Sequence, residues 1–288
     1  MTTMTTRFAT AAVHATTAVV VGGAVQRSTA QPAFALPRGA LDDETVRLAA
    51  ISRRAAELDL RGFAQRANVE RQKFLRRQKD AADRRDRRSY DAAKRELEKY
   101  DAQMREKIEG ILYPGLPAGA RQSYITAHGC SAWTEPALRS IEAVSARGGV
   151  VELGAGSGHW ARALRSRGLD VVAFDDMSAL PTGVPPDPLL VRKGDETALS
   201  RDSSLHSRTL LLVFPDPGPM AKKTLAAFRG AVFVYVGEGR DGANADASFF
   251  DELEGSRWQL ESTVPLNPFP GNHEKMYIFR RRSRFLFW

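Results

Sequence analysis

Short apolar runs alternate with amphipathic stretches over residues 149–281, a pattern that is typical of strands alternating with helices. The run from Arg208 to Phe214 is almost continuously apolar, as in parallel strands that helices cover on both faces. Strands are predicted at residues 150–153, 169–174, 188–195, 208–214, 231–237, 258–264 and 275–281. Helices are predicted between them at residues 159–167, 221–228 and 248–254. The alternation indicates an α/β domain over residues 115–288.

Residues 41–110 have a different pattern, which predicts a charged helical arm ending before residue 115. The segment has no proline and only Gly62 before its closing Gly110, and Pro114 follows. Apolar residues recur there at three- and four-residue steps, which places them on one helix face. These residues are Tyr90, Ala93, Leu97, Tyr100, Met104, Ile108 and Ile111. The pattern favours a solvated helical hairpin whose apolar stripe packs on the next domain.

Charge is distributed unevenly along the chain. Lys and Arg number 42 against 34 Asp and Glu, which gives a net charge of +8. Most of the excess lies in the first 110 residues, and residues 71–90 are its most basic stretch. A nucleic-acid-binding domain normally carries its excess charge where it contacts the polymer. Residues 111–288 are nearly neutral, which argues against nucleic acid as the main partner. The alternative that the helical arm binds a polyanion or a partner helix stays open.

The first acidic residue is Asp42, and residues 1–40 are rich in Ala, Thr and Val with three arginines. Such segments are typical of removable organelle transit peptides, which predicts a plastid or mitochondrial location. A signal-peptide core at residues 17–25, or a disordered tail on a cytoplasmic protein, are the alternatives. No uninterrupted apolar stretch of about 18 residues occurs, so no transmembrane segment is expected in the mature chain. Cys130 alone can form neither a disulfide framework nor a zinc–thiolate site, and no metal is expected.

The chemistry-bearing motif lies between the first predicted strand and the following helix, where the chain reads Gly154-Ala-Gly-Ser-Gly158. Glycines permit a tight turn and a close approach of a ligand to the backbone. The helix that follows presents unpaired N–H groups at its start. The second strand ends at Asp175-Asp176, about 20 residues on, where a carboxylate can accept hydrogen bonds from two ribose hydroxyls. Together these features predict a nucleotide-type cofactor site.

Two classes of cofactor use such a loop. The dinucleotide fingerprint is G-x-G-x-x-G, whereas this sequence has G-x-G-x-G followed by His159 and Trp160. The missing third glycine argues against a nicotinamide-dependent oxidoreductase. This class stays an alternative, and binding of NAD would support it.

With Glu152 in the strand before it, the loop reads Glu-x-Gly-x-Gly-x-Gly, which resembles motif I of class I S-adenosylmethionine (SAM)-dependent methyltransferases. The resemblance implies a Rossmann-like seven-stranded sheet whose last two strands form an antiparallel edge hairpin. It also implies that the loop holds the methionine part of SAM, and that the acid after the second strand holds the ribose. The candidate cofactor-binding residues are Glu152, Gly154, Ala155, Gly156 and Gly158 for methionine, Asp175 or else Asp176 for ribose, Asp195 for adenine, and Phe214.

A closer resemblance covers most of residues 128–281. The segments Ala132-Trp133, 151–164, 209–221, 234–238, 249–253 and 265–271 are similar to a group of mostly uncharacterised methyltransferase-like proteins. That group has Trp-Pro-Pro after the fourth strand, where this chain has Phe214-Pro-Asp. The group implies no particular substrate.

Methyl transfer depends mainly on bringing the nucleophile and the methyl group together in a site that excludes water. Asp216, in the loop after the fourth strand, could orient or deprotonate an acceptor, or could simply form a turn. Glu238 follows the fifth strand at the same expected edge and is the second catalytic candidate. Phe214-Pro-Asp-Pro217 loosely resembles the Asn/Asp-Pro-Pro-Tyr motif of amino-group methyltransferases, which points to nitrogen as the methyl acceptor.

The sequence therefore predicts methyl transfer from SAM to an unidentified small-molecule or protein acceptor. One alternative is a SAM-binding or scaffold protein without catalysis. A second is an RNA methyltransferase that uses the basic arm.

Overall fold

A computed structural model describes residues 44–145, 148–178, 180 and 185–282. The predicted targeting segment at residues 1–40 lies outside the described residues. The described chain forms two compact units, one of residues 51–120 and the other of residues 121–282 together with 44–50. None of the helices in the described residues is long and apolar enough to cross a membrane.

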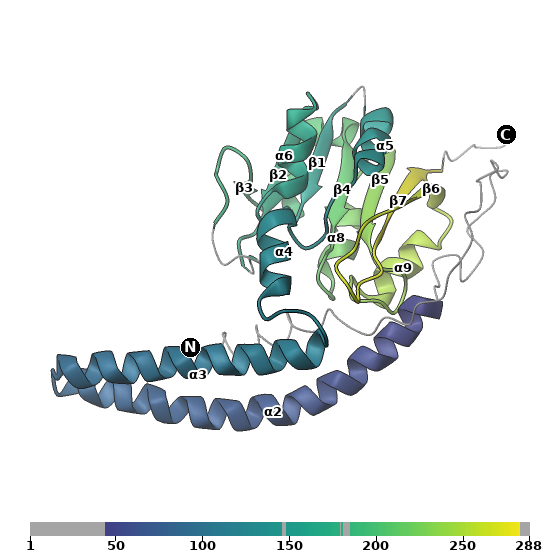
Figure 1. The fold of residues 1–288 in the computed structure, drawn as a ribbon. Helices are drawn as coiled ribbons and strands as arrows, with labels where there is room; N and C mark the ends of the chain where they lie inside the picture. Colours follow the sequence, from purple (N-terminus) through teal and green to yellow (C-terminus); the bar gives the residue numbers. More distant parts are fainter. Residues whose placement is uncertain (1–43, 146–147, 179, 181–184, 283–288) are drawn as a thin grey trace, which may run out of the picture. The chain divides into compact units, whose positions relative to one another are not determined.

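The first unit contains a hairpin of two long antiparallel helices, α2 (Glu44–Asp83) and α3 (Arg87–Leu112), joined by a three-residue turn (Figure 1). The first seven residues of α2 belong to the second unit. Arg71 on α2 forms a two-pronged ion pair with Asp101 on α3, at N–O distances of 2.8 and 2.9 Å. The Tyr100 hydroxyl donates to the Ala67 carbonyl oxygen across the same pair of helices. The predicted arm is therefore confirmed as a helical hairpin.

The predicted apolar stripe on α3 is only partly buried. Ala93 and Leu97 are buried, as predicted for residues of the stripe, while the prediction that the stripe packs on the next domain stays a prediction. Ile111, at the end of the predicted stripe, is 44% exposed, so the prediction is wrong at that position. The next residues, Leu112 and Tyr113, are buried instead, so the buried face at the end of α3 is shifted from the predicted one by one or two residues.

The second unit contains a seven-stranded sheet in the order β3-β2-β1-β4-β5-β7-β6. The first five strands are parallel, and β7 is antiparallel to both β5 and β6, as predicted. The strands are β1 (Val150–Leu153), β2 (Val171–Asp175), β3 (Arg192–Lys193), β4 (Thr209–Val213), β5 (Val232–Gly237), β6 (Trp258–Pro265) and β7 (Lys275–Arg281). The predicted α/β class and its edge hairpin are confirmed.

β3 is much shorter than predicted. The sequence favoured a strand over residues 188–195, but only Arg192 and Lys193 pair with β2. Asp187 instead begins a turn, in which its carboxylate accepts from the Leu189 N–H and its carbonyl accepts from the Leu190 N–H. Prolines on both sides of Asp187 lack the N–H groups that a strand would need.

Helices cover both faces of the sheet (Figure 1). One face packs against α5 (Glu135–Ser145) and α6 (His159–Ser166), and the other packs against α7 (Thr197–Arg201), α8 (Met220–Ala227) and α9 (Ala247–Leu253). A 3₁₀ turn, η1 (Ser203–Ser207), precedes β4, and α4 (Ala120–His128) begins this part of the chain. Helices α4 and α5 were not predicted. The arrangement brings the carboxyl ends of the parallel strands to one edge of the sheet, where such folds bind ligands.

Candidate functional site

The glycine loop (residues 154–158) connects β1 to α6 at this edge, as predicted. Gly158 precedes α6 with a backbone φ of 75°, in the left-handed region that favours glycine. A β-carbon at Gly158 would lie 2.8 Å from side-chain carbons of Leu190 and Val191. The backbone conformation and the close packing at position 158 therefore both favour glycine.

Asp175, the last residue of β2, is held against the glycine loop. One of its carboxylate oxygens accepts from the Gly156 N–H at 2.8 Å, and the other accepts from the Met177 N–H at 2.8 Å. Asp176 is exposed, and its carboxylate accepts from the Ser178 N–H. The structure thus brings Asp175, rather than Asp176, next to the loop.

Glu152 lies in the middle of β1 and is 1% exposed. Burial raises the pKa of this carboxyl to about 8, and the nearby negative charge of Asp175 raises it further, while the Ala161 N–H counteracts both. Its Oε2 atom is buried and has no hydrogen-bond partner within the described part of the chain. A largely neutral carboxyl group with one unpaired oxygen therefore lies in the strand that leads into the glycine loop.

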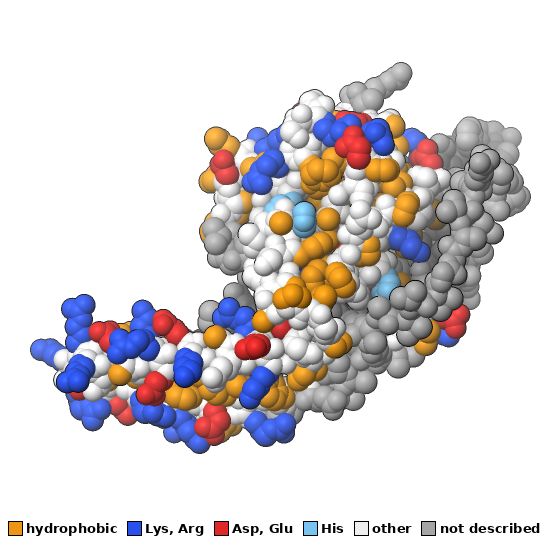
Figure 2. Space-filling model, in the orientation of Figure 1, with side chains coloured by type: hydrophobic (Ala, Val, Ile, Leu, Met, Phe, Trp, Pro, Cys, Tyr) orange, Lys and Arg blue, Asp and Glu red, His pale blue; other side chains and the backbone are white. Residues whose placement is uncertain are grey.

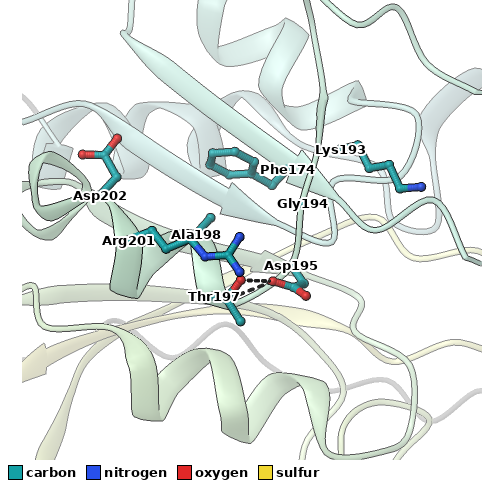
Figure 3. A pocket seen from close by; sticks show the side chains of 8 residues that line it. All are labelled: Phe174, Lys193, Gly194, Asp195, Thr197, Ala198, Arg201 and Asp202. Atoms are coloured by element: carbon teal, nitrogen blue, oxygen red, sulfur yellow. Dashed lines mark hydrogen bonds between the residues drawn. The ribbon is translucent and has the colours of Figure 1, made fainter.

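Asp195 follows β3, beside the strand end that carries Asp175, because Gly194 donates its N–H to the Asp175 carbonyl oxygen. The Asp195 carboxylate accepts from the Thr197 N–H and hydroxyl, and these hydrogen bonds lower its pKa. Figure 3 shows Asp195 at the rim of an open pocket of about 270 Å³ that Phe174 also lines. None of the loop glycines lines this pocket, so we do not assign it as the main cofactor site.

The loop after β4 contributes Phe214 and Asp216. Phe214 is buried with a φ of 51°, and its N–H donates to the Val236 carbonyl oxygen of β5 at 2.7 Å. Asp216 is exposed, yet the protein around its carboxyl and the negative charge of Asp175 raise its pKa. The predicted catalytic residue therefore lies within electrostatic range of the predicted ribose acid.

Glu238, the second catalytic candidate, is fully buried. Its Oε2 atom accepts from the Ala243 N–H at 2.7 Å, and its Oε1 atom accepts from the His273 N–H at 2.9 Å. Its own N–H donates to the Asn244 side-chain oxygen. These contacts tie the loop after β5 to the loop before β7 and favour a positioning role, while the predicted catalytic role stays a prediction.

Sequence reasoning missed four buried polar residues that surround the same edge, namely Arg121, Ser131, Asn272 and Glu274. Burial raises the pKa of Glu274 to about 7, and the negative charge of Glu238 contributes. The residues come from α4, from the segment after it and from the loop before β7, so no compact motif in the sequence could have identified them.

Neither metal binding nor thiol chemistry is favoured at this site. No group of three potential metal ligands occurs among the residues that the structure describes. Burial raises the pKa of the Cys130 thiol to about 11, so the thiolate is scarce near neutral pH.

No protein-family model matches the chain, and a comparison with curated proteins also found no match. Solved structures do resemble it. The 1,6-didemethyltoxoflavin-N1-methyltransferase of Burkholderia thailandensis, solved with S-adenosylhomocysteine, is 19% identical over 57% of this chain and 87% of that one, with a TM-score of 0.35. An rRNA methylase of Streptococcus thermophilus is 16% identical over 51% and 94% of the two chains, with a TM-score of 0.34.

A third solved structure concerns the conversion of a disulfide bond into a thioacetal group during echinomycin biosynthesis. It is 17% identical over 51% of this chain and 81% of that one, with a TM-score of 0.34. The sheet itself decides the fold, because β7 is inserted antiparallel between β5 and β6 at the end of an otherwise parallel sheet. With this strand order and a glycine loop after β1, the chain has the Rossmann-like class I methyltransferase fold.

Proposed function

We propose that this chain is a SAM-dependent methyltransferase whose cofactor lies across the glycine loop and the end of β2. The observation that carries the proposal is the position of Asp175, whose carboxylate accepts from the Gly156 N–H at 2.8 Å. The strand, the loop and the acid occur in the order that a nucleotide-type cofactor requires. A structural turn in an unrelated fold would need neither the acid nor its contact with the loop.

The residues at this edge fit SAM. Gly158 is packed against Leu190 and Val191, which holds the glycine loop in place beside the end of β2. Glu152 lies two residues before the loop, and its buried Oε2 atom has no hydrogen-bond partner among the described residues. Asp175 would hold the ribose, Asp195 would contact the adenine, and Phe214 would lie beside the cofactor. Bound SAM supplies a methyl group on a positively charged sulfur.

The protein's own contribution is to position the acceptor and to exclude water. Phe214 supplies a buried apolar wall, and its strained backbone presents the Asp216 loop at the edge of the sheet. The raised pKa of Asp216 makes this carboxyl a better proton acceptor than an ordinary aspartate. We propose nitrogen as the methyl acceptor on this basis, with Asp216 orienting it.

The test is a measurement of thermal denaturation midpoints of the full chain with SAM, S-adenosylhomocysteine and NAD. A ligand at a hundredfold excess over its Kd stabilises the native state by roughly 2.7 kcal/mol. We expect a rise with both sulfur-containing ligands and none with NAD. Asp175→Ala should abolish the rise, and the neighbouring Asp176→Ala should retain it. A rise with NAD alone, or none with any ligand in a folded sample, would contradict the proposal.

Binding without catalysis is separated from turnover by a second measurement. The full chain is incubated with tritium-labelled SAM and size-fractionated extracts, and the label is followed into small-molecule, protein and RNA fractions. Label in the small-molecule or protein fraction supports the methyltransferase proposal. Binding of SAM with no label in any fraction would favour the non-catalytic scaffold.

RNA methylation is the second candidate function, because four exposed arginines gather at the turn of the helical hairpin. These are Arg84, Arg85, Arg87 and Arg88. We keep a small-molecule or protein acceptor as the favoured class, since part of the remaining charge on the hairpin is paired within it and the sheet unit is nearly neutral.

We also propose that residues 1–40 form an organelle-targeting segment that is removed after import into a plastid or a mitochondrion. Mass spectrometry of the amino terminus of the organelle-purified protein tests this. A mature chain that begins near residue 40 supports the proposal, and a chain that retains Met1 contradicts it.

A further inference from the structure

Four polar side chains are buried together in the sheet unit, away from the protein surface. They form the buried polar cluster, defined as Arg121, Ser131, Asn272 and Glu274, whose exposed fractions are 5%, 1%, 3% and 1%. Arg121 is on α4, Ser131 follows that helix, and the other two residues are in the loop between β6 and β7. The cluster therefore combines one cation, one carboxyl group, one amide and one hydroxyl.

Most of the polar atoms in this cluster have no protein partner. Within the described residues, fourteen buried side-chain nitrogen and oxygen atoms lack a hydrogen bond, and seven of them belong to these four residues. They are Nε and Nη1 of Arg121, Oγ of Ser131, both amide atoms of Asn272 and both carboxyl oxygens of Glu274. A buried polar atom that stays unpaired destabilises the fold, and native proteins leave few of them so. Seven such atoms in four neighbouring residues make this cluster a candidate site for a polar ligand, with buried water as the alternative occupant.

The surroundings of the cluster restrict the shape of that molecule. The Arg121 guanidinium lies 5.3 Å from the ring centre of Tyr124 and 5.1 Å from that of Phe269. The ring of Phe214, in the loop after β4, is 5.9 Å away. Among the described residues, one hydrogen bond holds the guanidinium, from Nη2 to the Cys130 carbonyl oxygen at 3.3 Å. Three aromatic rings thus lie near a guanidinium group that makes only one hydrogen bond among the described residues. A planar ligand can pack against such rings and accept hydrogen bonds from the remaining guanidinium N–H groups.

Charge restricts the ligand further. Arg121 contributes one positive charge, and Glu274 contributes one negative charge when it is ionised. The two groups interact electrostatically, and the Ser131 hydroxyl lies close enough to the Glu274 carboxyl to lower its pKa by hydrogen bonding, although the two groups do not meet strict distance and angle criteria for a hydrogen bond. A ligand with a net charge would leave one of these buried charges uncompensated, which is costly at low dielectric. A neutral ligand that has both a hydrogen-bond donor and an acceptor satisfies them together.

The cluster is close to the predicted reaction site. The Cys130 thiol interacts electrostatically with Arg121 and Glu274 of the cluster, and also with Asp216 and Asp175 of the predicted cofactor edge. Phe214 contacts the cluster and begins the Asp216 loop. The cluster and the cofactor edge are therefore neighbouring parts of one region.

We propose that the buried polar cluster is the binding site for the methyl acceptor, and that this acceptor is a small, neutral, planar molecule with an amide-like N–H and C=O or ring nitrogen. Glu274 accepts from the N–H, Arg121 donates to the carbonyl oxygen or ring nitrogen, and Asn272 and Ser131 supply the remaining contacts. The inference rests on the proposed methyltransferase function, which it deepens by naming the substrate class.

Three probes of almost identical shape test the proposal, namely benzamide, which is neutral, benzoate, which is anionic, and benzamidine, which is cationic. Their affinities for the full chain are measured by isothermal titration calorimetry at pH 8, with and without S-adenosylhomocysteine. We expect benzamide to bind at least tenfold more tightly than either charged probe. Equal affinities for the three, or no benzamide binding in a folded sample, would overturn the proposal and leave buried water as the occupant of the cluster.

Charge-changing variants provide a readout that a purely structural role would not move. Glu274→Gln leaves Arg121 unbalanced and should shift the preference from benzamide to benzoate by about tenfold, whereas Arg121→Met should shift it to benzamidine. The control is Glu261→Gln, the same chemical change on the exposed face of β6, where Glu261 pairs with Arg280. If either variant keeps the wild-type order of affinities for the three probes, the replaced residue does not contact the ligand as proposed.

The same titrations separate this inference from the proposed function. Binding of S-adenosylhomocysteine without benzamide selectivity refutes the acceptor site and leaves the methyltransferase proposal standing. Selective benzamide binding without S-adenosylhomocysteine binding supports the polar ligand site and refutes the methyltransferase function. Failure of both, in a sample that is folded by circular dichroism, refutes both.

Discussion

Glu152 shows how one buried carboxyl group can make the whole protein sensitive to pH. Its pKa is about 8 in the folded protein, against an ordinary value of 4.5. Between these values the folded chain keeps a proton that the unfolded chain releases, so the free energy of unfolding falls as the pH rises. Glu274, with a folded pKa of about 7, acts in the same direction.

We predict that Glu152→Gln flattens this pH dependence, because the amide does not titrate. Relative to wild type, the decrease in unfolding free energy between pH 5.5 and pH 8 should be smaller by on the order of 3 kcal/mol. Urea denaturation at the two pH values measures it, with Glu261→Gln as the exposed control. An unchanged pH dependence in Glu152→Gln would show that the buried carboxyl is already ionised at pH 5.5.

Gly158 offers a second prediction at the same scale. Gly158→Ala places a methyl group in a left-handed backbone conformation and 2.8 Å from side-chain carbons of Leu190 and Val191. We expect a loss of about 1–3 kcal/mol of stability from strain and crowding, and at least tenfold weaker binding of S-adenosylhomocysteine. Gly168→Ala is the matched control, since Gly168 has a φ of 86° with nothing within 4 Å of a β-carbon. Gly168→Ala should lose some stability and bind S-adenosylhomocysteine as tightly as the wild type. Equal losses of S-adenosylhomocysteine binding in both variants would refute a specific role for Gly158.

The two parts of the candidate site differ in how far the sequence could predict them. The glycine loop is contiguous, and the acid it needs comes at a known distance, so the amino-acid sequence alone is enough to associate Gly156 with an acid at residue 175 or 176. The choice between Asp175 and Asp176 could not be made in that way, because it depends on which carboxylate reaches the Gly156 N–H. Arg121 and Glu274 are about 150 residues apart in the sequence, and only the folded sheet brings them together.

At the scale of elements, the ion pair between Arg71 and Asp101 connects the two helices of the hairpin. Its two parallel N–O contacts cross from α2 to α3, and Asp101 raises the pKa of Arg71. Both side chains are about one-quarter to one-third exposed, so solvent screens the pair in part.

A double-mutant cycle with Arg71→Met and Asp101→Asn should give a coupling energy of roughly 0.5–1 kcal/mol at low salt, decreasing in 1 M NaCl. The control cycle uses Lys94 and Glu98, which lie on one helix at an N–O distance of 3.9 Å and are more exposed. We expect a smaller coupling there, measured by the same chemical denaturation. A coupling between Arg71 and Asp101 no larger than that of the control would mean that apolar packing alone sets the register.

Elements with a strong apolar period were predicted well, and elements without one were not. β4 and β5 are continuous apolar runs, and the structure places them within a residue of the predicted bounds. β3 was overextended because Leu189 and Val191 suggested a strand that the proline-rich turn prevents. Helix α4 has buried residues only at Arg121 and Ile125, which is too sparse a pattern to recognise.

For the whole molecule, the question is what the excess positive charge does. Figure 2 shows Lys and Arg interspersed with Asp and Glu along the hairpin. Arg71, Lys73 and Arg77 form ion pairs with acids of the same hairpin, which reduces the field available to an external polyanion. Such pairing is expected of a solvated hairpin. At the turn between the two helices, four exposed arginines occur within five residues, and one of them, Arg87, lies 4.0 Å from the Asp91 carboxylate.

We therefore expect any affinity of the full chain for RNA to depend on the turn. Replacing Arg84, Arg85, Arg87 and Arg88 together by glutamine should reduce the slope of log K against log salt for a single-stranded RNA by up to about 3, since each lost phosphate contact removes roughly 0.7. The control replaces the exposed Lys222 and Lys223 of α8 by glutamine and should leave the slope almost unchanged. S-adenosylhomocysteine binding should be unaffected in both variants, since no predicted cofactor residue is altered. A wild-type chain without salt-sensitive RNA binding would rule out the RNA methyltransferase alternative, whereas a steep slope that the turn variant abolishes would make RNA the first acceptor to test.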